Sequence, residues 1–181
     1  MRKNKNQIRT YNIIMINVFL RCLLLLSFTA TSHASSLSDY KRLAQDTIAK
    51  VQNSGIGDID QLIDQQSKLV QLGVKACEEY ASKHPTAKPV LHLVISNAES
   101  MKQLSLDEIE EKWHKGGELK KYGYTVKEDH FGDVGNLIDA VIHPATSYIA
   151  LNYYKTSGDN SHLQQVVAEL SEVLVHLQHL E

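Results

Sequence analysis

The fold is decided by one stretch, Val134 to Tyr154, with the sequence VGNLIDAVIHPATSYIALNYY. Its apolar residues recur every three or four positions, at Val134, Leu137, Ile138, Val141, Ile142, Ala145, Tyr148 and Ile149. This spacing places them on one face, so it predicts an amphipathic α-helix. Pro144 lies inside that helix, where it removes one backbone hydrogen bond and clashes with the preceding turn, at a cost of about 3 kcal/mol. We therefore expect a kink between Asp139 and His143.

The segments on both sides of this stretch show the same helical spacing. Further helices are predicted for residues 36–53, 58–83, 90–104 and 161–180, and a short one for residues 105–114. Ser105 and Glu108 have the spacing of a capping box at the start of the short helix, and two glycines follow its end. No run of residues has the alternation of a β-strand. The sequence predicts an all-α, single-domain antiparallel helical bundle, with four long helices plus short ones and a fifth helix kinked at Pro144.

The first 34 residues have the features of a secretory signal peptide. Their first twelve residues carry four basic side chains and no acid, and an apolar run over residues 13–28 follows. Small residues lead up to Ala34, as a signal peptidase requires. Arg21 divides the apolar run, which argues against a stable membrane span of about 20 apolar residues. We expect cleavage after Ala34 and a periplasmic or secreted domain of residues 35–181, with Met15 as an alternative start.

Removal of the signal makes the chain more acidic. The whole chain has a formal charge of −2, and the first 34 residues hold five Lys and Arg and no acid, which leaves −7 on the remainder. This balance argues against nucleic acids and anionic membranes as partners. Only Cys77 remains, so no intramolecular disulfide can form. We expect it to be a buried apolar residue, with a reactive thiol or an intermolecular disulfide as the alternative.

Histidines and carboxylates gather in and before the Val134–Tyr154 stretch. His114 follows two glutamates at helical spacing, and His143 follows an aspartate by four residues, which places each imidazole beside a carboxylate. A third histidine lies between them, in a loop rich in glycine. Imidazole and carboxylate together suit a divalent transition metal such as Zn²⁺. The predicted metal site comprises His114, His130, Asp139 and His143, with Glu110 and Glu111 as weaker candidates.

Other interpretations of these residues stay open. His143 and a second histidine could hold a non-covalent haem, whereas covalent haem is excluded because the chain has no Cys-x-x-Cys-His motif. An Asp–His pair can also act as a general base, although no nucleophile at a strained turn accompanies it. In a purely structural interpretation the pairs only satisfy one another and Trp113 is a packing anchor. The polar face of the last helix, which includes Glu169, is expected to be solvated. The alternative is a weak surface metal site at Glu172, His176 and His179.

The function predicted from these features is a non-catalytic, exported binding protein that ligates a metal or haem. One alternative is a structural or adaptor bundle that binds a protein partner, and another is a metal-dependent enzyme. A ligand site predicts that His114 and His143 face inward within metal-bridging reach. An adaptor predicts a contiguous exposed apolar patch, and an enzyme predicts a pocket with an open metal position.

Overall fold

The computed structural model describes residues 32–53, 57–125 and 132–180, and helices form nearly all of them. The long helices are α2 (Ser32–Asn53), α3 (Ile59–Lys83), α6 (Asp133–Ser157) and α7 (Ser161–His176), with α4 (Lys88–Met101) slightly shorter. Short helices complete the chain: α5 (Leu106–Ile109), the π-helix η1 (Glu110–His114) and the 3-10 helices η2 (Leu119–Tyr122) and η3 (Leu177–Leu180). No strand occurs in these ranges, so the predicted all-α helical bundle is confirmed.

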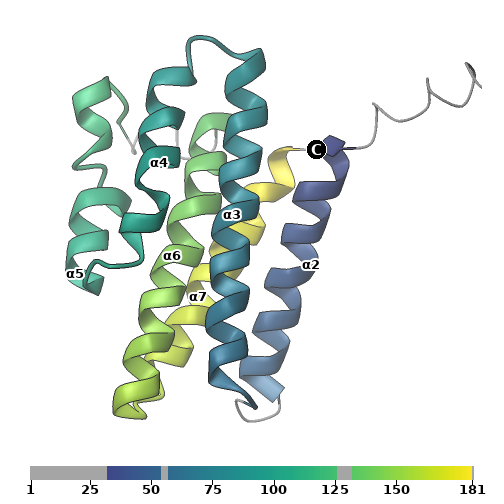
Figure 1. The fold of residues 1–181 in the computed structure, drawn as a ribbon, viewed down its shortest axis with the longest axis vertical. Coiled ribbons are helices and arrows are strands. Elements are labelled where there is room, and N and C mark those ends of the chain that lie inside the picture. The colour runs from purple at the N-terminus through teal and green to yellow at the C-terminus, as the bar shows by residue number, and fades with distance from the viewer. Residues whose placement is uncertain (1–31, 54–56, 126–131, 181) are drawn as a thin grey trace, which may run out of the picture. The chain divides into compact units, whose positions relative to one another are not determined.

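Helix α6 is the central element of the bundle. It packs against α3 and α7 along most of its length, and against α4 and α5 on another side (Figure 1). The long helices lie lengthwise beside one another in this view. Because α6 has neighbours on several sides, nearly every residue from Gly135 to Leu151 is buried. A helix enclosed in this way places several polar residues inside the protein, and of these His143 and Thr146 contact the other residues of the candidate site.

Helices α3 and α6 run antiparallel, and three contacts fix their register. Near one end, the Tyr80 hydroxyl donates a hydrogen bond to Asp133 Oδ2 at 3.4 Å. Further along, Cys77 Sγ lies 3.3 Å from the carbonyl oxygen of Leu137. At the other end, the Lys155 ammonium pairs with an aspartate at the start of α3. Residue numbers therefore increase along α6 in the direction in which they decrease along α3.

Helices α3 and α6 approach each other closely at Gly73 of α3. A Cβ atom at this position would lie 2.7 Å from the carbonyl carbon of Ala140, and its distance to the carbonyl oxygen would be shorter still. The Ala140 carbonyl is the one that Pro144, four residues later and without an N–H, cannot bond. The absence of a side chain at Gly73 lets its backbone cover this carbonyl, where a Cα–H···O contact can form. The helix is continuous across Pro144; the kink there stays a prediction.

Helix ends follow the predicted signals. Asp58 caps α3 by accepting hydrogen bonds from two backbone N–H groups, and the capping box of Ser105 and Glu108 is present at the start of α5. Gly158 ends α6 in the left-handed conformation, with φ of 70°. The last helix differs from prediction, since its α-helical part stops at His176 and a 3-10 turn follows.

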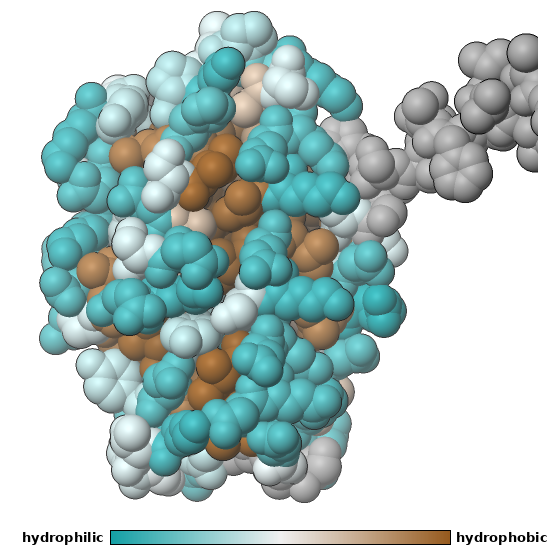
Figure 2. All heavy atoms as spheres, in the orientation of Figure 1, coloured by the Kyte–Doolittle hydropathy of each residue, from teal (hydrophilic) through white to brown (hydrophobic). Residues whose placement is uncertain are grey.

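The surface of the described residues is largely polar. Three large hydrophobic side chains are exposed in this part of the chain, Tyr122, Tyr153 and Val175, and they belong to different helices. Figure 2 shows hydrophilic side chains over most of one face, with hydrophobic atoms in a narrow band between them. Within the ranges described, no helix combines the length and hydrophobicity needed to cross a membrane.

Candidate metal centre

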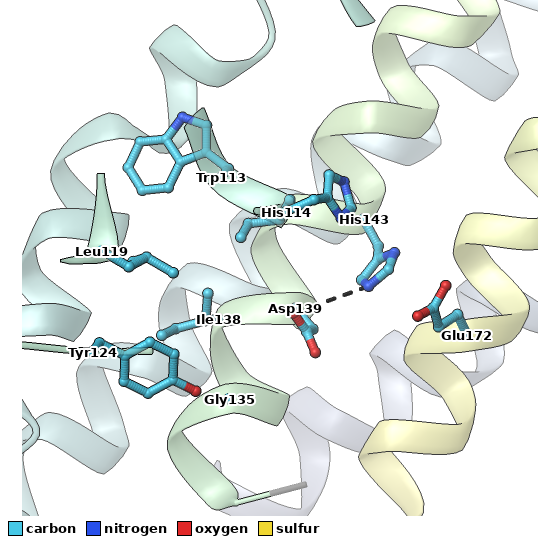
Figure 3. A pocket seen from close by; sticks show the side chains of 10 residues that line it. Trp113, His114, Leu119, Tyr124, Gly135, Ile138, Asp139, His143 and Glu172 are labelled. Carbon is cyan, nitrogen blue, oxygen red and sulfur yellow. Dashed lines mark ion pairs between the residues drawn. The ribbon is translucent and has the colours of Figure 1, made fainter. Parts of the chain in front are cut away.

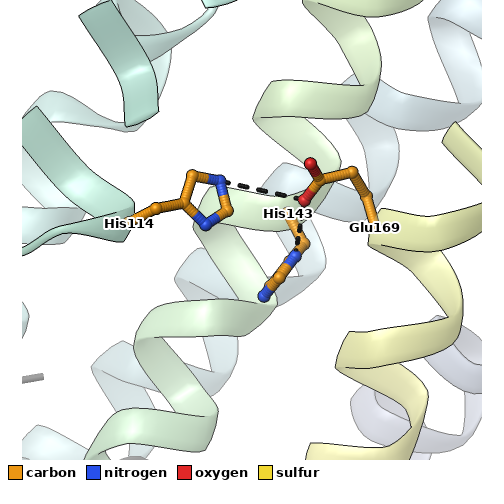
Figure 4. A group of neighbouring side chains, drawn as sticks. All are labelled: His114, His143 and Glu169. Atoms are coloured by element: carbon orange, nitrogen blue, oxygen red, sulfur yellow. Dashed lines mark hydrogen bonds and ion pairs between the residues drawn. The ribbon is translucent and has the colours of Figure 1, made fainter. Parts of the chain in front are cut away.

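Three helices each contribute one side chain to a group of potential metal ligands. His114 comes from η1, His143 from α6 and Glu169 from α7, and their ligand atoms all lie within 4.8 Å of one another. His143 Nδ1 is 2.6 Å from Glu169 Oε2, and His114 Nε2 is 3.8 Å from the same oxygen. Figure 4 shows the three side chains pointing toward one another from their separate helices.

His114 reaches the group because the chain widens into a π-helix just before it. The Lys115 N–H donates to the Glu110 carbonyl, five residues back, at 2.9 Å. The neighbouring Trp113 is only 3% exposed and belongs to the hydrophobic core, which confirms its interpretation as a packing anchor. The anchored tryptophan fixes the direction in which His114 leaves the helix.

Thr146 of α6 orients the ring of His114. The Thr146 hydroxyl donates to the Ile142 carbonyl at 3.1 Å, and its oxygen lies 2.9 Å from His114 Nε2. Because the hydroxyl hydrogen is used in the first bond, the second bond assigns the hydrogen to Nε2 of His114, which acts as donor. This hydrogen bond holds the ring toward α6 in the metal-free protein, and an ion bound at Nε2 would replace it, with the ring hydrogen moved to Nδ1.

A second group of potential ligands shares His143 with the first. It consists of Asp139, His143 and His176, whose ligand atoms also lie within 4.8 Å of one another. His176 Nδ1 is 2.8 Å from Asp139 Oδ2, and His143 Nε2 is 4.0 Å from Asp139 Oδ1. Both imidazoles are only 3% exposed. A carboxylate therefore lies near each ring nitrogen of His143, Glu169 near Nδ1 and Asp139 near Nε2.

The two histidines of the first group have pKa values shifted in opposite directions. Burial acts to lower the pKa of His143, but the hydrogen bond to Glu169 and the charge of Asp139 outweigh it, so the pKa is raised. The pKa of His114 is lowered, first by burial and then by the nearby charge of His143. In the metal-free protein, His143 thus keeps its proton to a higher pH than an ordinary imidazole does, and His114 loses its proton at a lower pH. The neutral ring is the form that binds metal ions.

A small cavity of about 40 Å³ lies beside these groups. Its lining includes His114, Asp139, His143 and Glu172, and the apolar side chains of Trp113 and Ile138 close it (Figure 3). A water molecule needs roughly 10–15 Å³ of such space, so the cavity has room for about three. The side chains of Asp139 and Glu169 keep 15% of their surface exposed, so both are partly accessible to solvent.

The structure brings some of the predicted site residues together and leaves others apart. His114, Asp139 and His143 all line the cavity. Glu110 and Glu111 are exposed and belong to neither ligand group, and Glu111 pairs with Lys115 instead. His130 lies outside the described residues.

Glu169 is not among the ligands predicted from the sequence, and His176 is predicted only as part of a weak surface metal site. The prediction that both side chains are exposed to solvent is wrong for His176, which is 3% exposed. It is only partly right for Glu169, which is partly buried. A signal was present, because Val166, Glu169, Val173 and His176 follow one another at steps of three, four and three, the spacing of a buried stripe. Glu172 is exposed and lines the cavity; the side chain of His179 lies outside the part described.

The first group has ligand types that suit Zn²⁺, and two of its separations can be compared with those of a zinc site. Zn²⁺ binds imidazole nitrogen and carboxylate oxygen at about 2.0–2.2 Å, so tetrahedral ligands lie roughly 3.3 Å apart. The observed separations from Glu169 Oε2, 2.6 and 3.8 Å, bracket that value. Small side-chain movements would therefore complete the geometry.

No protein-family model, no curated protein and no solved structure matches this chain, so no relative supplies a function for the site.

Proposed function

We propose that this chain binds a divalent transition metal ion, with Zn²⁺ as the best fit, through His114, His143 and Glu169. The observation that carries the proposal is the convergence of three ligand atoms, from three helices, within 4.8 Å. Two imidazoles and one carboxylate match the ligand preference of Zn²⁺ and exclude the all-oxygen coordination typical of Ca²⁺ and Mg²⁺.

The size of the cavity separates metal binding from its alternatives. Pockets for organic ligands usually enclose about 300–1,000 Å³, whereas the cavity beside His143 has about 40 Å³. This space suits an ion with bound water and argues against haem. Three protein ligands with a fourth open position also occur in catalytic zinc sites. However, a substrate of more than a few atoms does not fit, which favours a binding protein over an enzyme.

Export of the protein is the second part of the proposal. The basic start, the apolar run and the small residues before Ala34 support a cleaved signal. Cleavage after Ala34 would leave the compact unit Ser36–Glu181 entire. Cell fractionation and N-terminal sequencing test this part. A mature chain that begins at Ser35 in the periplasmic or secreted fraction supports it, and an uncleaved cytoplasmic chain contradicts it.

The metal proposal is tested on protein recovered without chelators. Elemental analysis should find zinc or another transition metal bound, and calorimetric titration of the metal-free protein with Zn²⁺ should show saturable binding. His143→Ala should abolish both, and Glu169→Gln should weaken affinity at least tenfold. His92→Ala is the matched control, because His92 is exposed on α4 and lies in neither group. A metal-free protein that refuses added Zn²⁺, or equal binding by the His143 and His92 variants, overturns the proposal.

A further inference from the structure

Carboxylate and imidazole groups alternate in a line through the centre of the bundle. From Glu169 Oε2 the line passes to His143 Nδ1 at 2.6 Å, and from His143 Nε2 to Asp139 Oδ1 at 4.0 Å. It ends at His176 Nδ1, 2.8 Å from Asp139 Oδ2. His143 thus has one ring nitrogen toward each ligand group. An ion at the first group and an ion at the second would use different atoms of the same ring.

We propose that Asp139 and His176 bind a second divalent metal ion, and that His143 bridges the two ions through its two ring nitrogens. This inference rests on the proposed metal binding at His114 and Glu169 and extends it to a two-ion centre. The chain itself provides the five ligands that such a centre uses, since His114 and Glu169 belong to one ion and Asp139 and His176 to the other, with His143 shared.

The space beside His143 is common to both groups. The cavity of about 40 Å³ is lined by His114 from the first group, by Asp139 from the second and by the shared His143. It holds about three water-sized spheres, which is room for coordinated water on either ion. The ring planes of His143 and His176 are inclined at 70°, with centroids 6.0 Å apart, so the rings do not stack and block the space between them.

The charges near the site balance those of two ions. A bridging ring has a metal on each nitrogen, so it releases its ring protons to solvent and carries one negative charge. Asp139 and Glu169 add two more, and Glu172, which lines the cavity, adds the fourth. Two divalent ions bring four positive charges. Glu172 is exposed, so solvent also screens its share of this charge.

The test uses Cu²⁺ as the probe ion, because its electron spin reports on a neighbouring ion. The full protein is stripped of metal, loaded with Cu²⁺ and desalted, and bound copper is counted by elemental analysis. We expect two ions per chain and an electron paramagnetic resonance intensity well below that of two isolated ions, since a shared imidazolate couples their spins. His176→Gln should retain one ion, at His114 and Glu169, with full intensity. His114→Gln should also retain one ion with full intensity, at Asp139 and His176.

Controls separate this inference from the proposed function. His92→Gln should bind and couple copper as the unaltered protein does, and His143→Gln should lose both ions. Circular dichroism verifies folding, and Asp139→Asn replaces His176→Gln if that variant does not fold. A single ion that depends on His143 but not on His176 or Asp139 overturns the second site and leaves the first. Two ions at full intensity overturn the bridge. A chain that binds no ion overturns the proposed function itself.

Discussion

Replacement of Gly73 by alanine tests whether the contact between α3 and α6 positions the site. The new Cβ would lie 2.7 Å from the carbonyl carbon of Ala140 and 3.1 Å from Val141 Cγ2. Carbon atoms in contact prefer separations of about 3.5–4.0 Å, so at Ala140 the shortfall is about 0.8 Å. The atoms that would have to yield belong to the backbone of α6, which cannot rotate away as a side chain can.

The magnitude follows from two opposing effects. Overpacking of a core typically destabilises by about 1–3 kcal/mol, and a clash against backbone belongs at the upper end of that range. Alanine recovers about 1 kcal/mol because it is a better helix former than glycine. We therefore expect Gly73→Ala to lower the free energy of unfolding by about 2 kcal/mol, which corresponds to roughly 4–8 °C in melting temperature for a chain of this size. Zn²⁺ affinity should also fall, since Ala140 adjoins Asp139 and precedes His143 by one turn.

The matched control for this variant is Gly57→Ala. A Cβ at Gly57 meets nothing within 4 Å, so its stability should stay within about 0.5 kcal/mol of the parent. Urea unfolding followed by circular dichroism measures both variants. If Gly73→Ala is as stable as Gly57→Ala and binds Zn²⁺ as tightly as the parent, the close approach at Ala140 does not set the spacing of the helices.

Four further predictions concern protons, the thiol and the ion. Because the pKa of His143 is raised above its ordinary 6.5, protons compete with the metal below that pKa, and Zn²⁺ affinity should fall about tenfold per pH unit there; titrations at pH 5–8 check this. In the metal-free protein, the stabilisation from protonated His143 is fully present below pH 6.5 and is lost as pH rises through the raised pKa, so the stability difference from His143→Gln, measured by urea unfolding, should shrink over that range. Burial raises the pKa of the Cys77 thiol to about 12, so only about 10⁻⁴ of it is thiolate at pH 8; labelling by a disulfide reagent should be slow until denaturant unfolds the chain. Zn²⁺ at a hundred times its Kd should stabilise the fold by about 2.7 kcal/mol, a shift in thermal melting that EDTA should reverse.

The fold could be predicted because helix formation leaves a local record in the sequence. The three- and four-residue spacing within α3, α6 and α7 and the capping box at Ser105 depend on near neighbours only. The close fit of Gly73 against Ala140 could not be predicted, since it depends on the register of two helices that are distant in the sequence. The π-helical turn before His114 was missed for a related reason, because residues 110–114 have the pattern of an ordinary helix.

The candidate site was only half predictable. His143 stood out because a costly proline follows it, and Asp139 because it lies one helical turn before. Glu169 and His176 were assigned to a solvated face, since charged and polar residues on the last helix usually are exposed. Both side chains instead face α6, where His143 lies beside Glu169 and Asp139 lies beside His176. Such pairing across helices appears only when the tertiary arrangement is known.

The π-helix η1 makes the site depend on how one helical turn is wound. Each residue of an α-helix turns the next side chain by about 100°, and the wide turn over Glu110–His114 accommodates one residue more than an α-helical turn would. If the same residues wound as a regular α-helix, position 114 would be rotated away from its present direction toward α6. Every ligand would still be encoded in the gene. The winding of a single turn therefore separates a chain with this centre from a similar bundle without it.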